Sequence, residues 1–204
     1  MPVIDIIFSI IVVVMSVVVH EVSHGLVAEK LGDPTARLQG RLTLNPLKHL
    51  DPLGSVILPA IMAFINPKFI IGWAKPVPYN PRNISHRYGD ALVAGAGPLS
   101  NIILVIIFGL IFRFAGPLGF ATVSLYKLLY MIVVINCGLA IFNLMPIPPL
   151  DGSKILFSLL PKRARAIEQF LEQNVLVVLI VFIFVLSPIL SPIILGFARL
   201  ATGV

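Results

Sequence analysis

The chain has 204 residues, of which 58% are hydrophobic and 12% are charged, and its mean hydropathy is +1.01. Because a soluble domain carries about 25% charged residues, the composition excludes an ordinary soluble protein and indicates a polytopic membrane protein. We expect one domain over residues 1–204. The formal net charge of +6 does not indicate nucleic-acid binding, since Lys and Arg lie between apolar runs, where they orient a protein in the lipid bilayer. The single cysteine, Cys137, excludes a disulfide framework.

The first apolar run extends from Val3 to about Leu31, which is long enough for a transmembrane helix. His20 follows Val3 by 17 residues, or about 26 Å of helix. It is therefore expected inside a hydrocarbon core about 30 Å thick, toward its second face. The sequence Gly32-Asp33-Pro34 predicts the end of this helix. Because cleavage after the run would remove His20, we expect no cleavable signal peptide.

This run contains the sequence His20-Glu21-Val22-Ser23-His24. On a helix, the two histidines share one face, and two imidazoles one turn apart can bind one zinc ion. Glu21 can take a proton from a water that the zinc activates. The alternative is a pair of membrane-buried histidines whose polar atoms are satisfied by neighbours. An ionisable triplet inside a membrane span is costly and by default functional, which favours the metal site.

The middle of the chain predicts less regular structure. Alternation in Arg41-Leu42-Thr43-Leu44 indicates a short strand or hairpin around Gly40. His49 and Asp51 could form a second polar site, although a loop His-x-Asp is more often solvated. Residues 53–74 are apolar but interrupted by Asn66-Pro67-Lys68, and a proline-rich extended loop follows over 75–83.

The second half of the chain predicts two further spans, over residues 91–112 and from about 126 to 145. The first of these opens with Gly95-Ala96-Gly97-Pro98, where small side chains allow close helix contact. A short helix over 151–160, a basic loop and a last apolar run over 174–195 with Pro188 and Pro192 complete the chain. The predicted fold class is an all-α polytopic transmembrane helix bundle with a short β-hairpin or re-entrant segment after the first helix.

A zinc site needs a third protein ligand, and Asp151 is the acidic residue next to a membrane segment that stands out. If residues 53–74 crossed the membrane, Asp151 would lie on the face opposite His24. If they are re-entrant or interfacial, the next two spans return the chain to the correct face. The basic residues agree, because loops 30–51, 67–90 and 154–165 carry Lys or Arg and the stretch 114–126 carries none.

The motif at 20–24, combined with Asn143-Leu144-Met145-Pro146 and the following Leu150-Asp151-Gly152, resembles the site-2 protease family of intramembrane zinc metalloproteases. The segments 40–46 and 96–101 resemble its short prokaryotic branch, without PDZ or CBS domains. The resemblance implies one Zn²⁺ per chain held by His20, His24 and Asp151, with Glu21 as the general base. It also implies action on transmembrane segments of membrane-protein substrates. The basic loops predict a multi-pass cell-membrane protein with its active site toward the cytoplasm.

The remaining expected site residues concern the substrate. Asn143 matches the family's asparagine and is the candidate donor to the oxyanion, unless it only bonds between helices. Asn101 belongs to a segment with the same resemblance and is a further candidate substrate or oxyanion contact. An unwound substrate needs partners for its freed backbone groups. Strand addition onto an edge at Arg41–Asn45 would supply them, which adds the four residues Leu42, Thr43, Leu44 and Asn45. The alternative is a plain surface hairpin.

A second class of function competes with the protease: a non-catalytic membrane protein that binds or transports a divalent metal. A transporter is expected to place ionisable groups along a path through the bilayer. Here they cluster at one depth, and the two halves of the chain show no inverted repeat. Glu21 also discriminates, since a passive metal site needs no unligated base. The sequence therefore favours the protease, while the oligomeric state stays open.

Overall fold

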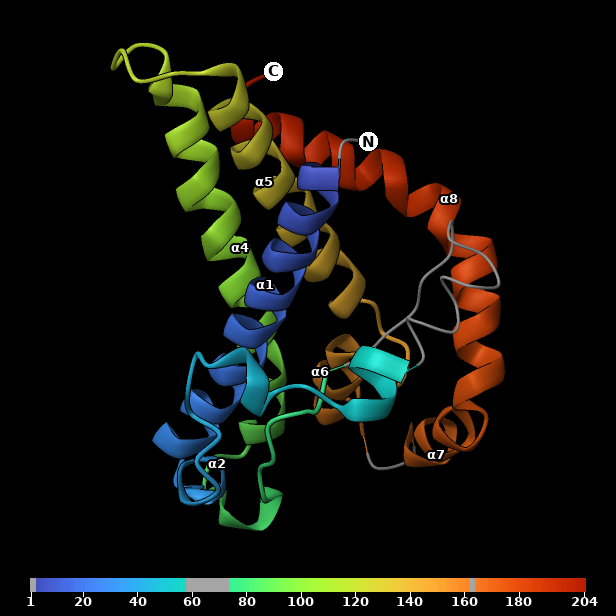
Figure 1. Cartoon of the computed structure of the whole chain (residues 1–204). Helices are drawn as coiled ribbons and strands as arrows, with labels where there is room; N and C mark the ends of the chain where they lie inside the picture. Colours follow the sequence, from blue (N-terminus) through green and yellow to red (C-terminus); the bar gives the residue numbers. More distant parts are fainter. Residues whose placement is uncertain (1–2, 58–73, 162–163) are drawn as a thin grey trace.

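The computed structural model describes residues 3–57, 74–161 and 164–204, and within these ranges the regular elements are helical. Among the described residues, three helices are long and apolar enough to cross a membrane: α1 (Val3–Lys30), α4 (Gly89–Ala115) and α5 (Val123–Asn143). They contact one another and run as neighbouring rods in Figure 1. The protein is therefore a multi-pass membrane protein built on a helical bundle, and the three long spans lie where the sequence predicts them.

α1 ends at the predicted place, because Gly32 adopts a φ of 109°, which other residues rarely reach. The Gly32 N–H donates to the Glu29 carbonyl at 3.0 Å, and the Asp33 N–H donates to the Ala28 carbonyl at 2.9 Å. These two bonds satisfy carbonyls that the helix end would leave open. The buried Asp33 carboxylate then accepts the Asn80 N–H at 2.6 Å, which fixes the end of α1 to the chain that leads into α4.

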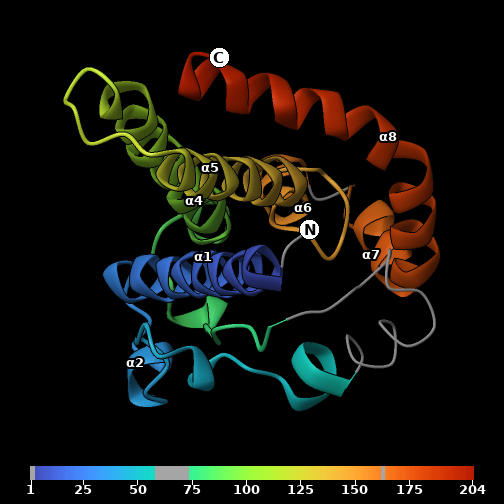
Figure 2. The same ribbon diagram turned by 45° about the horizontal axis from the view of Figure 1, so that its top comes forward.

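α4 is the central helix, since it packs against α1, α5, α6 (Asp151–Leu159) and α8 (Val175–Thr202). Figure 2 shows α1 and α5 on either side of it. The face toward α1 includes the small buried residues Gly97, which lies next to His20 and His24, and Ala94, which lines a pocket with these two histidines. Short side chains let two helix backbones approach closely, so the small residues at the start of α4 have the packing role that the sequence predicts.

The chain after α5 makes a tight turn into α6, where a Cβ at Gly152 would overlap the Leu144 carbonyl oxygen. The sequence did not predict α7 (Arg165–Gln173), which follows α6. α8 is one helix of 28 residues that continues through Pro188 and Pro192, where the sequence suggested interruptions. Figure 1 shows it bending around the bundle. Its far end packs against α5, where Ala198 joins a buried cluster with Val133 and Cys137.

The region between α1 and α4 differs in part from expectation. Residues 35–38 form α2 (Thr35–Leu38), residues 46–48 form η1 (Pro46–Lys48), and no strand is seen in the described part of the chain, so the hairpin is unconfirmed. Of the segment 53–74, the structure describes the π-helical turn η2 (Pro52–Ile57), and residues 58–73 lie outside the description. Its flanks meet, because the Lys75 N–H donates to the His49 carbonyl at 2.9 Å. A short 3₁₀ turn, η3 (Pro81–Asn83), precedes α4.

Candidate metal centre

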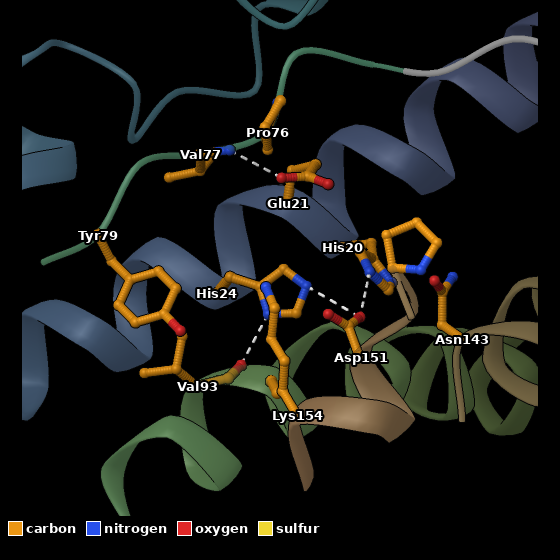
Figure 3. A pocket seen from close by; sticks show the side chains of 12 residues that line it. His20, Glu21, His24, Pro76, Val77, Tyr79, Val93, Asn143, Asp151 and Lys154 are labelled. Carbon is orange, nitrogen blue, oxygen red and sulfur yellow. Dashed lines mark hydrogen bonds and ion pairs between the residues drawn. The ribbon is translucent and has the colours of Figure 1, made fainter. Parts of the chain in front are cut away.

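His20 and His24 from α1 and Asp151 from the first position of α6 converge on one point (Figure 3). The His20 Nε2 lies 3.1 Å and the His24 Nε2 lies 3.3 Å from the Asp151 Oδ2. All three candidate ligand atoms lie within 4.8 Å of one another, and the three residues are at most 9% exposed. The structure therefore brings together the three metal ligands that the sequence predicts.

The Nδ1 atoms of His20 and His24 form hydrogen bonds that determine the orientation and the tautomer of the two imidazoles. The His24 Nδ1 lies 2.7 Å from the Val93 carbonyl oxygen, which can only accept, so the proton of the neutral ring is on Nδ1. The His20 Nδ1 lies 2.7 Å from the Asn101 Oδ1. With both protons on Nδ1, both Nε2 lone pairs point at the Asp151 carboxylate. Lone pairs that face a carboxylate repel it, so the arrangement calls for a cation between them.

A buried chain of amides sets the orientation of Asn101. The Asn136 Nδ2 donates to the Ile132 carbonyl at 2.9 Å and to the Ser16 hydroxyl at 3.0 Å. Because a carbonyl cannot donate, the Asn136 Oδ1 faces Asn101 and accepts its Nδ2–H at 2.9 Å. That leaves the Asn101 Oδ1 facing His20. Hydrogen bonds of this kind behind a metal-binding histidine fix its tautomer and ring orientation.

The donor set fits zinc. Two imidazole nitrogens and a carboxylate oxygen with room for a water form the ligand set of catalytic zinc sites. A tetrahedral site with zinc–ligand bonds of about 2.0–2.1 Å has ligand atoms about 3.3 Å apart, close to the two Nε2–Oδ2 distances of 3.1 and 3.3 Å. Asp151 acts as a metal ligand in its ionised form.

Glu21 and Asn143 line the same pocket as the three ligands. Glu21 is half-buried and its Oε2 accepts the Val77 N–H at 2.8 Å. The Asn143 Nδ2 donates to the Leu139 carbonyl at 3.0 Å, which leaves its second N–H free. The other lining residues come from the loop before α4, from α4, and from the α5–α6 turn and α6: Pro76, Val77, Tyr79, Val93, Ala94, Pro149 and Lys154.

The chain is similar to one known protein family and to several named proteins. The pattern of "Peptidase family M50" matches residues 8–186. The chain belongs to this family. "Putative zinc metalloprotease YwhC" of Bacillus subtilis (strain 168) is 38% identical over 197 residues, which cover 90% of this chain and 86% of that protein. "Putative zinc metalloprotease Rip2" of Mycolicibacterium smegmatis is 30% identical over 171 residues, which cover 83% of this chain and 64% of Rip2. "Zinc metalloprotease MJ0392" of Methanocaldococcus jannaschii is 30% identical over 149 residues, 73% of this chain and 33% of that protein. No solved structure matches the chain.

Membership of M50 confirms the resemblance seen in the sequence and makes the protein a zinc metalloprotease. The group formed by His20, His24 and Asp151 can bind the metal ion that this chemistry requires. Peptides are the substrate class of the family.

Several residues expected near the substrate do not line this pocket. Asn101 is fully buried behind His20 and is absent from the pocket lining. The four residues 42–45 are also absent from it. Leu42 packs toward Gly25 on α1, and Asn45 caps η1 by accepting the Leu47 N–H. His49 is 1% exposed and bonded to the Thr43 carbonyl at 2.8 Å, so the expectation of a solvated His-x-Asp site was wrong for the histidine.

One wall of the pocket, formed by residues that precede α4, was not predicted from the sequence. Pro76, Val77 and Tyr79 line it, although the sequence indicated only a proline-rich loop there. Burial raises the pKa of Tyr79 to about 12, with the nearby Asp90 and Asp151 carboxylates adding to the effect. The phenol therefore stays protonated at neutral pH. The Lys154 Nζ lies 5.8 Å from the centre of its ring, within the range of a cation–π contact.

Gly97 supports a prediction about the metal centre that changes no ligand. A Cβ at this position would lie 2.5 Å from His20 Cε1 and from the Nε2 atoms of both histidines, and their Nδ1 bonds prevent the rings from moving away freely. We expect Gly97→Ala to weaken zinc binding by at least about tenfold, as disturbed ligand orientation does. Zinc affinity of the purified variant measures this. Gly95→Ala is the matched control, since its nearest new contact is Ile155 Cδ1 at 3.9 Å, and equal losses in both variants would contradict the prediction.

Proposed function

We propose that this M50 member is an endopeptidase that hydrolyses peptide bonds within transmembrane segments of membrane proteins. One observation carries the proposal: the ligand group on α1 and α6 lies in a bundle whose long helices suit a membrane. We also propose that residues 1–204 act as one protease domain, because α8 packs onto α5 through the cluster around Ala198. The rival reading, a metal transporter, lacks an observation of its own in the described part of the chain.

The proposed mechanism assigns a role to each pocket residue. A zinc ion held by His20, His24 and Asp151 would polarise the scissile carbonyl and supply an activated water. Glu21 takes the proton of the attacking water and passes it to the leaving amine. The free N–H of Asn143 donates to the oxygen that becomes negative during attack. Asn101 acts behind His20, as a group that orients the imidazole.

A helical substrate hides its peptide bonds, so the segment to be cleaved must unwind locally. The freed N–H and C=O groups then need partners inside the membrane. Strand addition at residues 41–45 stays the prediction for these partners. Leu44 is 56% exposed there, so its side chain is accessible to an incoming chain.

A cleavage assay tests the proposed function. The purified protein in lipid vesicles is given two substrates with the same cleavable sequence, one inside a transmembrane segment and one as a soluble peptide. We expect cleavage of the membrane-inserted substrate, with at least about tenfold slower cleavage of the soluble peptide, because only the former approaches the site through the bilayer. Zinc flux across the vesicle wall without cleavage of either substrate would instead support a transporter.

We further propose that residues 53–74 do not cross the bilayer and that the pocket faces the cytoplasm. The hydrogen bond between Lys75 and His49 supports this, since it joins the two flanks of the segment. The basic residues of loops 30–51 and 67–90 support the orientation. Single cysteines at Lys48 and Arg82, after replacement of Cys137, should both react with a membrane-impermeant reagent only from the cytoplasmic side. Labelling of Arg82 from outside while Lys48 reacts from inside would disprove the topology.

A further inference from the structure

A segment with three prolines crosses the pocket beside Glu21. We call residues 75–81 the proline segment, after Pro76, Pro78 and Pro81. The Val77 N–H donates to the Glu21 Oε2 at 2.8 Å (Figure 3). Because proline has no N–H, Val77 is the amide donor between two positions that cannot donate. The segment therefore presents a single backbone donor to Glu21 at this point.

The proline segment is fastened on both sides of this contact. On one side, the Arg41 Nη2 donates to the Lys75 carbonyl at 2.8 Å and to the Pro76 carbonyl at 3.3 Å. Arg41 is 7% exposed, so its Nη2 makes these contacts in a buried position. On the other side, the Asn80 N–H donates to the buried Asp33 carboxylate at 2.6 Å.

Val77 itself is packed onto α1. It is 6% exposed, and a Cβ at Gly25 would lie 2.7 Å from its Cγ1. Gly25 follows His24 directly, so Val77 rests on the turn that carries the metal ligand. Pro78, which follows it, disfavours the helical region for Val77 and restricts its backbone to extended conformations. A flap that opens would be loosely held, whereas this segment is anchored on both sides of the buried Val77, although its two ends are exposed.

We propose that the Val77 amide is a positioning group for the general base. The hydrogen bond holds the Glu21 Oε2, which leaves Oε1 to face the metal group and the attacking water. Glu21 is half-buried on α1. The residue before it, His20, is fixed by its hydrogen bond with Asn101. The Glu21 carboxylate would otherwise rotate about the side-chain bonds. Arg41 acts one step further back, because it holds the two carbonyls that precede Val77.

The inference rests on the proposed function and concerns kcat rather than substrate or metal binding. Displacement of a reacting group by about 1 Å can cost about 100-fold in rate. Loss of the Val77 N–H should thus lower kcat strongly. KM and zinc content should stay the same, since Val77 holds no metal ligand.

Val77→Pro is the test, because it removes the N–H and replaces the valine side chain with another apolar group, the proline ring, in an extended segment. We expect kcat to fall about 100-fold, with one zinc per chain and KM within about twofold of the wild type. Val77→Ala is the conservative comparison, since it keeps the amide and loses only side-chain contacts. It should recover most of the lost rate. A purely structural role of Val77 predicts the opposite order, with the smaller alanine more harmful than proline.

A second pair of variants decides the question if Val77→Pro fails to retain zinc. Arg41→Met removes the donor to the Lys75 and Pro76 carbonyls, while Arg41→Lys can still donate to one of them. The inference predicts a fall in kcat for the Met variant at unchanged KM and zinc content, with partial recovery in the Lys variant.

The outcomes separate the two proposals. If the wild type does not cleave a membrane-inserted substrate, the proposed function fails. If the wild type cleaves and Val77→Pro or Arg41→Met, with zinc bound, cleaves as fast, only the positioning role fails. Faster cleavage by Val77→Pro would overturn the inference in a specific way, because it would mean that the amide competes with water for Glu21.

Discussion

Replacement of Glu21 with glutamine is expected to abolish peptide hydrolysis while zinc stays bound. Glutamine keeps the size of the side chain and cannot accept a proton, so the general base is lost and both histidines remain. General acid–base groups contribute about 10²–10⁴-fold to rates, and we expect a loss at the upper end of that range. A cleavage assay and metal analysis on the same purified sample measure both properties.

Glu29→Gln is the matched control for this variant. It makes the same chemical change on the same helix, at a residue that pairs with Arg37 and lies outside the pocket. Its cleavage rate should equal that of the wild type. If Glu21→Gln also turned over at the wild-type rate, the base would have to be another group, and Glu21 would be only a hydrogen-bond acceptor for Val77.

Removal of the third ligand, by Asp151→Ala, is expected to lose zinc and activity together. Two imidazoles would remain without the ionised carboxylate that lies 3.1 and 3.3 Å from them. Since loss of a group behind a ligand weakens metal binding by 10–100-fold, loss of a ligand itself should exceed about 100-fold. Zinc affinity and stoichiometry of the purified variant provide the measurement.

Asp5→Ala controls for the general effect of removing a carboxylate from this bundle. Asp5 pairs with Lys127 at 2.5 Å between α1 and α5 and is absent from the pocket lining. Its loss should leave one zinc per chain. Full zinc occupancy in Asp151→Ala would assign the third ligand position to another residue.

The three long helices and the ligand group could be predicted from simple signals in the sequence. A long apolar run indicates α1, and the spacing of His20 and His24 places both on one face. Asp151 reaches the same depth in a count of membrane crossings if residues 53–74 do not cross the bilayer. Each inference needs only helical geometry and the thickness of the bilayer. The structure adds the distances and the partners of the outer nitrogens.

The supporting contacts could not be predicted because they depend on residues far apart in the chain. Val77 meets Glu21 across 56 positions, and Asn101 meets His20 across 81. The proline-rich sequence predicts only a loop between two helices. Nothing in it indicates that the Val77 amide faces the Glu21 carboxylate. Asn101 was assigned to the substrate side for a similar reason, since a motif does not reveal on which side of the histidine its asparagine lies.

α8 illustrates a different limit. Pro188 and Pro192 suggested interruptions, because proline removes a helical hydrogen bond and crowds the preceding turn. In the structure the helix continues through both. Buried contacts such as Phe182 and Leu190 packed around Leu150 hold it on both sides of Pro188. Tertiary packing therefore outweighs the local preference.

A zinc titration of the metal-free protein tests whether this metal centre performs the proteolysis. Protein stripped with a chelator is returned to vesicles that contain a transmembrane substrate, and bound zinc and cleavage rate are measured on the same samples. We expect the rate to rise in proportion to bound zinc and to saturate at one zinc per chain, with no rise in Asp151→Ala. Cleavage by the zinc-free protein, or saturation of zinc at the His20, His24 and Asp151 site without any cleavage, would contradict the proposed function.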